Sequence, residues 1–280
     1  MLILVLICWI TNACEENINV ELPAYEPKLV VEGWIEQDKY ARVILTESAA
    51  FFDKIDSAAL RNSIVTTAKV TVSNGDETEI LTLNKEDEFF PSYVYQSTQI
   101  KGKVGETYEL KVEVGGEEYA ARTSVTAPAS LDSIWFERLA DQDSVGEVRL
   151  RYTDPVAERN QYRIFTKRLN KDKSFVPVYL SVIDDRSFNG ETIDFSLLRG
   201  SESLSEVTDD IYFHTGDTVM IKFCTMDETH YQYWKNLENE LYAAKNPLYA
   251  SGNEVVGNIE GNALGVWGGY GASYYWFVAE

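Results

Sequence analysis

The side chains best suited to metal binding or acid–base catalysis are few in this chain, and they do not cluster. The two histidines, His214 and His230, have no second histidine or cysteine at metal-ligand spacing. Acidic runs at 86–88, 184–185 and 209–210 offer oxygen ligands for calcium, but none has the spacing of an EF-hand loop. We therefore expect these runs to be solvated loop charges, and we expect no metal or cofactor site.

Motifs for nucleophilic or phosphate chemistry are also missing from the sequence. It contains no G-x-S-x-G elbow, Walker loop or dinucleotide fingerprint. Cys224 lies in the apolar run VMIKFCTMD, which predicts a buried, inert thiol. We expect a non-enzymatic protein, and a hydrolase that uses two converging carboxylates is the least favoured alternative.

A stretch rich in glycine and aromatic residues, NIEGNALGVWGGYGASYYWF, lies close to the C-terminus. Large aromatic side chains more often fill cores than bind ligands, so core packing is the favoured interpretation. The alternative is a recognition surface for a sugar or a partner protein. Its candidate contact residues are Trp267, Tyr270, Tyr274 and Trp276.

Alternating apolar and polar runs predict that strands dominate residues 28–127. Seven short runs rich in β-branched or aromatic residues are separated by turn signals such as Asn74-Gly75 and Gly115-Gly116. This pattern is typical of an immunoglobulin-like sandwich. Tyr108 opens a run after a glycine-containing turn, as the tyrosine of a tyrosine corner does.

A second β-rich region follows the proline-containing segment TAPASLDS, which we take as the domain boundary. Residues 128–280 contain further alternating runs and one stretch with helical periodicity, 227–246. Asp227 suits the N-cap of that helix, and Pro247 follows its end. The prediction is mainly β: two consecutive immunoglobulin-like or fibronectin-like sandwiches, the second with one packed helix near the C-terminus.

The N-terminus has the features of an export signal. Residues 2–10 form one apolar run that is too short to span a bilayer but has the length of a signal-peptide core. Cys14 follows Ala13 directly, which resembles a bacterial lipobox, although a plain secretory signal is the alternative. We expect a signal peptide over 1–13, a lipid on Cys14 and an extended tether over 14–27.

Glu15 and Glu16, directly after that cysteine, resemble the signal that exports lipoproteins to the cell surface in Bacteroidota-type bacteria. The expected location is therefore the outer membrane, with the protein anchored by lipid and exposed at the cell surface.

Charge and short motifs bear on the partners of the protein. The formal net charge of −20 repels phosphate backbones, so nucleic acid is not an expected partner. Asp-Ser/Thr-apolar triplets resemble the O-glycosylation acceptor of exported Bacteroidota-type proteins. Among them, Ser57 and Ser144 fall in predicted loops and are the candidate acceptors.

Several segments together resemble domain-of-unknown-function family 4249, lipoproteins of Bacteroidota. They are Cys14, LPAYEPKLVVEGWI, ETHYQYWKNLE and NPLYASGNEVVGNIEGNALGVWGGYGA, and N-I-x-G-x-A-L-G-V-W is the most specific pattern among them. Members tend to be encoded beside TonB-dependent outer-membrane receptors, so the resemblance implies a binding or accessory subunit of a nutrient uptake system. A structural or adhesive surface protein is the alternative function. The resemblance implies no catalytic residues.

Overall fold

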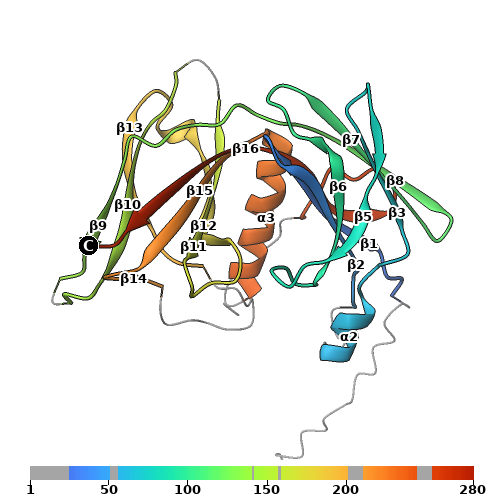
Figure 1. Cartoon of the computed structure of the whole chain (residues 1–280), viewed down its shortest axis with the longest axis horizontal. Helices are drawn as coiled ribbons and strands as arrows, with labels where there is room; N and C mark the ends of the chain where they lie inside the picture. Colours follow the sequence, from blue (N-terminus) through green and yellow to red (C-terminus); the bar gives the residue numbers. More distant parts are fainter. Residues whose placement is uncertain (1–24, 51–55, 141, 157–158, 201–210, 245–253) are drawn as a thin grey trace, which may run out of the picture.

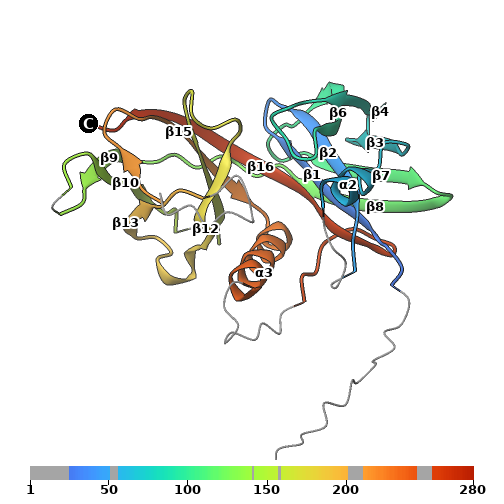
Figure 2. The same ribbon diagram turned by 90° about the horizontal axis from the view of Figure 1, so that it is seen from below.

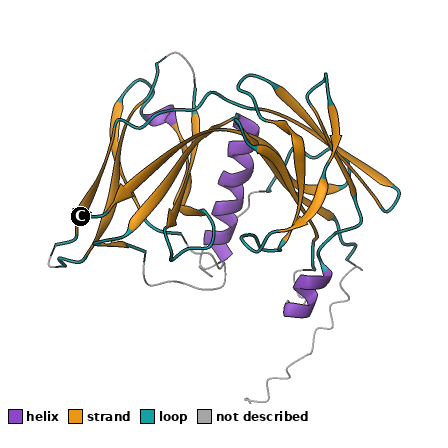
Figure 3. Ribbon diagram, viewed as in Figure 1, coloured by secondary structure: helices purple, strands orange, loops and turns teal. Residues whose placement is uncertain are grey.

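A computed structural model describes residues 25–50, 56–140, 142–156, 159–200, 211–244 and 254–280. Strands dominate it, and one long helix lies between two β-rich halves (Figure 3). The predicted signal peptide, the lipidated Cys14 and most of the tether lie outside the described residues. None of the described helices is long and apolar enough to cross a membrane.

The first half consists of strands and one short helix. Its elements are β1 (Leu29–Glu36), β2 (Tyr40–Glu47), α2 (Ser57–Asn62), β3 (Lys69–Ser73), β4 (Thr78–Ile80), β5 (Thr82–Lys85), β6 (Tyr93–Lys101), β7 (Thr107–Val114) and β8 (Glu117–Ser124). Asp56 caps α2, because its carboxylate accepts the backbone N–H groups of Ala58 and Ala59.

The second half adds the long helix and the longest strand. Its elements are β9 (Ser133–Arg138), β10 (Val145–Thr153), β11 (Gln161–Arg168), β12 (Val176–Asp184), η1 (Asp185–Ser187), β13 (Thr192–Leu197), β14 (Phe213–His214), β15 (Thr218–Met226), α3 (Glu228–Ala244) and β16 (Ala263–Val278). Asp227 caps α3 as predicted, since its Oδ1 accepts the N–H of His230 at 2.8 Å.

One eight-stranded sheet runs through both halves, in the order β12-β11-β15-β16-β1-β2-β6-β5. Strand β16 makes it continuous, and Figures 1 and 2 show this strand crossing the whole molecule. Residues 263–270 of β16 pair in parallel with β1, and residues 271–278 pair antiparallel with β15. A strand from the predicted second domain, 128–280, thus completes the sheet of the first half.

A separate four-stranded sheet packs on each half of the long sheet. The order β4-β3-β7-β8 covers the first half, and a sheet of β9, β10, β13 and β14 covers the second. One core is centred on Val31, Val43 and Leu110, and the other on Leu150, Ile164 and Phe223. The predicted mainly β fold, with sandwich-like sheets and one helix near the C-terminus, is confirmed.

The tyrosine corner predicted at Tyr108 is also present. The Tyr108 side chain is fully buried, its hydroxyl accepts the N–H of Lys103 at 2.9 Å, and that hydroxyl lies 3.0 Å from the carbonyl of Lys101. These contacts hold the turn before β7 against the strand, as the position of Tyr108 after a glycine turn predicts.

Glycines let other segments approach β16 closely on both faces. A Cβ on Gly269 would lie 2.2 Å from the carbonyl oxygen of Ser124, where the chain leaves β8. A Cβ on Gly268 would lie 1.9 Å from the ring of His230 on α3. The glycine-rich stretch is therefore explained by close packing against the interdomain connection on one side and α3 on the other.

Candidate functional site

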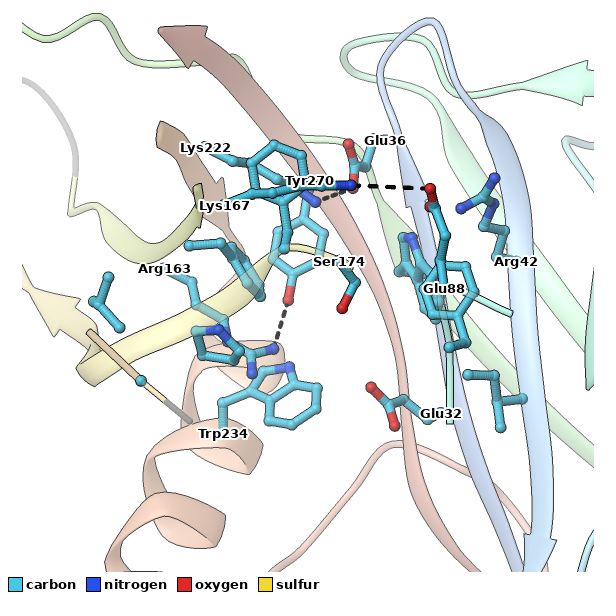
Figure 4. A pocket seen from close by; sticks show the side chains of 18 of the residues that line it. Glu32, Glu36, Arg42, Glu88, Arg163, Lys167, Ser174, Lys222, Trp234 and Tyr270 are labelled. Carbon is cyan, nitrogen blue, oxygen red and sulfur yellow. Dashed lines mark hydrogen bonds and ion pairs between the residues drawn. The ribbon is translucent and has the colours of Figure 1, made fainter. Parts of the chain in front are cut away.

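A large cleft lies between the two halves, on the face of the eight-stranded sheet that α3 partly covers. Its volume is about 1300 Å³. Strands β1, β2 and β6 contribute one wall, strands β11, β12, β15 and β16 contribute the other, and α3 closes one side (Figure 4). Because β16 joins the two walls, the cleft exists only when both halves are folded.

The cleft differs in composition from the rest of the chain. Of the 35 described residues that line it, 11 are aromatic, whereas aromatic residues make up 12% of the sequence. Seven lining residues are basic and five are acidic, although the whole chain has a net charge of −20. Aromatic surface and positive charge are therefore concentrated in this cleft.

Two strand motifs place charged and aromatic side chains on the cleft face. Residues two apart in a strand point to the same side of a sheet. In β1 the cleft side carries Glu32, Trp34 and Glu36, while Val31 and Ile35 enter the core. In β11 the cleft side carries residues 163, 165 and 167 (Arg, Phe and Lys), while Tyr162 and Ile164 enter the core of the second half. A charge–aromatic–charge pattern with period two was the signal in the sequence for this site.

A buried ion pair joins the two walls. The Lys222 ammonium on β15 contacts Glu36 Oε1 on β1, and the Tyr274 hydroxyl on β16 donates to Glu36 Oε2 at 2.5 Å. Burial alone would raise the pKa of the Glu36 carboxyl, but Lys222 and Tyr274 outweigh it and hold that pKa below its usual value. Burial opposes the charge of Lys222 as well, yet Glu36 raises the pKa of the ammonium. Both groups are therefore charged in the folded protein.

Arg163 lies at the bottom of the cleft and is only 5% exposed. Its guanidinium carbon lies 3.4 Å from the centre of the Trp234 ring and 4.7 Å from that of Phe165. Its Nη1 donates to the Tyr270 hydroxyl at 3.0 Å (Figure 4), and its Nε approaches Ser181 Oγ at 3.4 Å. No described carboxylate comes within ion-pair distance of this guanidinium, so aromatic rings and hydroxyls stabilise a nearly buried cation.

Glu32 projects from β1 into the same cleft, on the wall opposite Arg163 (Figure 4). The side chain is exposed to the solvent of the cleft and is one of the residues that line it. Desolvation by the cleft walls raises the pKa of the Glu32 carboxyl, and the charge of Arg163 only partly opposes the increase. Glu32 has no hydrogen bond or ion pair with the described residues.

Three side chains that line the cleft carry buried polar atoms without hydrogen-bond partners among the described residues. They are Gln96 through its Oε1, Trp234 through its Nε1 and His230 through both ring nitrogens. The backbone of Gly269 lies beside the His230 ring, and the Gly269 N–H donates to Thr123 Oγ1 at 2.8 Å. Burial, and then the nearby Arg163 cation, lower the pKa of His230 to about 3, so its ring is neutral.

The structure separates the four aromatic residues of the predicted recognition surface. Tyr270 and Tyr274 line the cleft. Trp276 is 61% exposed on β16 but is not part of the cleft lining. The prediction that Trp267 contacts a ligand is wrong, because its side chain is fully buried in the first core and its Nε1 donates to the Tyr108 carbonyl at 3.0 Å. Trp267 belongs to the core packing that was the favoured interpretation.

The remaining predicted residues are not part of the cleft lining. Ser57 and Ser144 are both exposed, and their glycosylation stays a prediction. Cys224 is a free, fully buried cysteine, as predicted, and burial raises the pKa of its thiol to about 12. Within the described part of the chain, no group of three or more His, Cys, Asp or Glu side chains could hold a metal ion.

Comparison with protein families identifies the chain. The family described as Domain of unknown function (DUF4249) matches residues 15–274. The chain belongs to this family. A search of curated proteins gives no match.

Among solved structures, the selenomethionine-substituted chicken interferon gamma receptor alpha chain is similar at 11% sequence identity and a TM-score of 0.21. The similarity covers 72% of this chain and 90% of the receptor chain. At this level it carries no argument about what the family member described here does.

Proposed function

We propose that this DUF4249 protein is a non-catalytic binding protein, tethered to the outer membrane through a lipid on Cys14, and that it serves a TonB-dependent uptake system. The cleft between the two halves carries the proposal. Ligand sites are concave, largely apolar and supplied with a few placed polar groups, and this cleft combines all three features. The tether would keep the cleft close to a receptor and raise its effective concentration there.

Unsatisfied polar groups support a binding role for the cleft. A buried polar atom without a partner costs about 1–3 kcal/mol, so folded proteins contain few of them. Three of the described side chains with such atoms, Gln96, His230 and Trp234, line this one cleft. The folded protein therefore carries a cost in stability at the positions where a ligand would bind.

The spacing of the two β1 carboxylates does not suit them as a glycosidase pair. Glu32 and Glu36 face the cleft four residues apart on one strand, so about 13 Å separates their backbone positions. Paired carboxylates of glycosidases lie roughly 5–10 Å apart. Glu36 is also occupied by Lys222 and Tyr274.

The test asks whether a native ligand copurifies with the protein and whether filling the cleft removes it. The protein is purified in mild detergent from its own membranes, and bound small molecules are identified by mass spectrometry. Leu237→Trp fills the cleft from α3, whereas Leu169→Trp places the same bulk on an exposed turn outside it. We expect one compound to accompany the wild type and Leu169→Trp but not Leu237→Trp. Equal profiles for all three proteins would refute a binding role for the cleft.

The same preparation tests the uptake assignment. Recovery of a TonB-dependent receptor with the wild type, and less of it with Cys14→Ala, is the expected result. A membrane-bound protein recovered without a receptor would contradict the accessory role and favour the adhesive alternative.

A further inference from the structure

Among the described cations of the cleft, Arg163 is the one that is nearly buried without a carboxylate partner. A guanidinium that is 5% exposed normally pairs with a carboxylate, because an unpaired buried charge is costly. Here the described neighbours of Arg163 are Trp234, Phe165, the Tyr270 hydroxyl and Ser181, and its Nη2 has no hydrogen bond with any of the described residues. A ligand carboxylate at this position would supply the missing charge and acceptor.

Glu32 on the opposite wall is a solvent-exposed carboxylate without a counter-charge among the described residues. Its side chain has no hydrogen bond or ion pair with them, and it lines the cleft. Arg163 acts on it electrostatically, but the two groups do not form an ion pair. The gap between them is therefore open to a group that carries both charges.

Several other charged groups of the cleft are already paired from within the protein. Glu36 is bound to Lys222 and Tyr274, and Glu238 accepts hydrogen bonds from both the N–H and the hydroxyl of Ser181. Lys167 donates to the carbonyl of Lys173 at 2.7 Å. Arg163 is thus a nearly buried cation without a carboxylate partner, and Glu32 is a carboxylate on the facing wall that no described cation pairs with.

We propose that the cleft binds a short peptide with free ends, whose carboxylate pairs with Arg163 and whose ammonium group pairs with Glu32. This inference rests on the binding function proposed above. A neutral sugar would leave the nearly buried Arg163 without a carboxylate, and a simple anion would meet Arg163 but be repelled by Glu32. A zwitterion is the class of ligand that satisfies both walls at once.

The size and lining of the cleft favour a peptide over a single amino acid. Pockets for small molecules commonly measure roughly 300–1000 Å³, and this cleft is larger, at about 1300 Å³. Its aromatic side chains, among them Trp34 and Phe89 with ring centres 5.6 Å apart, offer apolar surface for side chains between the two charged ends.

Calorimetry with defined probes tests this assignment. The probes are phenylalanine, the dipeptide phenylalanyl-alanine and the tripeptide alanyl-phenylalanyl-alanine, each titrated into the purified full chain. The probe that binds tightest is then repeated with its amine acetylated, with its carboxylate amidated and with both ends blocked. We expect each block to weaken binding about tenfold or more, because each removes one charge-assisted contact.

Two variants assign the ends of the peptide to the two walls. Glu32→Gln removes a charge that no described residue pairs with, and we expect it to abolish the preference for the free amine while the preference for the free carboxylate remains. Arg163→Met should do the reverse. If Arg163→Met does not fold, the result with Glu32→Gln and the blocked probes still decides the question.

The outcomes separate this inference from the proposed function. If no probe binds, or if the doubly blocked probe binds as well as the free one, the peptide assignment is overturned. A native ligand that is lost in Leu237→Trp and carries no ammonium or carboxylate group would also overturn it, while the binding function would stand. Failure of the native-ligand experiment would remove the binding function itself.

Discussion

Removing Lys222 should destabilise the protein strongly, because it leaves a buried carboxylate without its counter-charge. Lys222 is 7% exposed and Glu36 is 5% exposed, and their ion pair joins β15 to β1 across the intervening strand β16. In Lys222→Met, the Tyr274 hydroxyl is the remaining direct partner of Glu36 among the described residues. Breaking a buried pair by removing one partner costs about 3–5 kcal/mol, and we expect a loss in this range at pH 7.

Glu36→Gln, and the double variant that combines it with Lys222→Met, should both lose less stability than Lys222→Met alone. In Glu36→Gln the Lys222 ammonium keeps the faces of Phe165 and Tyr270, whose centres lie 4.9 and 5.3 Å away. In the double variant no unpaired charge remains, so its free energy of unfolding should lie within about 2 kcal/mol of the wild type. A double-mutant cycle then isolates the coupling between the two side chains.

The pH dependence of this loss has a definite sign. In the wild type the pKa of Glu36 lies below its value of 4.5 in the unfolded chain, so its contribution is present above that pH and is lost as the pH falls through the folded pKa. In Lys222→Met burial dominates, and the pKa of Glu36 rises above 4.5. Protonation then relieves the buried charge, so the deficit relative to the wild type should shrink as the pH falls from 7 towards 4.5.

Urea unfolding followed by tryptophan fluorescence at pH 7 and pH 5 measures these differences. A single-variant loss below about 1 kcal/mol at pH 7 would show that the pair is not effectively buried. A deficit that grows as the pH falls would contradict the charge assignment of Glu36.

Three further substitutions test the packing around β16, each by equilibrium unfolding. As the pH falls from 6.5 towards 3, the free energy of unfolding of the wild type should fall by about 1.4 kcal/mol per pH unit through His230, because the unfolded chain binds the proton first. His230→Gln should lack this component. Gly268→Ala should cost about 2 kcal/mol or more, since the new Cβ would lie 1.9 Å from the His230 ring, and His230→Ala in the same chain should recover part of the loss. Asn258→Ala should cost about 1–3 kcal/mol, because the amide of Asn258 bonds both the N–H and the carbonyl of Trp267, at 2.9 and 2.8 Å. The stability of Asn258→Asp should lie between that of Asn258→Ala and that of the wild type.

Much of the fold could be predicted because the decisive signals are local. Period-two alternation marks strands, period 3.6 marks α3, and a tyrosine after a glycine turn marks the corner at Tyr108. The Asn258 side chain explains why asparagine opens the most specific sequence pattern, as it bonds the backbone of Trp267 nine residues later. Each of these signals involves residues that lie close together in the sequence.

The site was harder to predict because it depends on a distant pairing. Leu29 pairs with Ala263 at the start of the β1–β16 ladder, and no local pattern announces a parallel pairing over such a separation. The charge–aromatic–charge faces that contain Glu32 and Arg163 are visible in the sequence, but only the shared sheet places them on opposite walls of one cleft. The burial of Trp267 likewise depends on distant residues, since Gly33 lies against its ring and its Nε1 donates to the carbonyl of Tyr108.

The continuity of the sheet also determines how the cleft can work. Two domains joined by a flexible linker close on a ligand by hinge motion, but here the walls are parts of one hydrogen-bonded sheet and are fastened further by the pair of Glu36 and Lys222. Opening the cleft widely would break the ladder of β16 with β1 or with β15. The charged and aromatic side chains are therefore held in place before a ligand arrives, which lowers the ordering cost of binding. A preformed cleft fits the capture function that we propose for this protein.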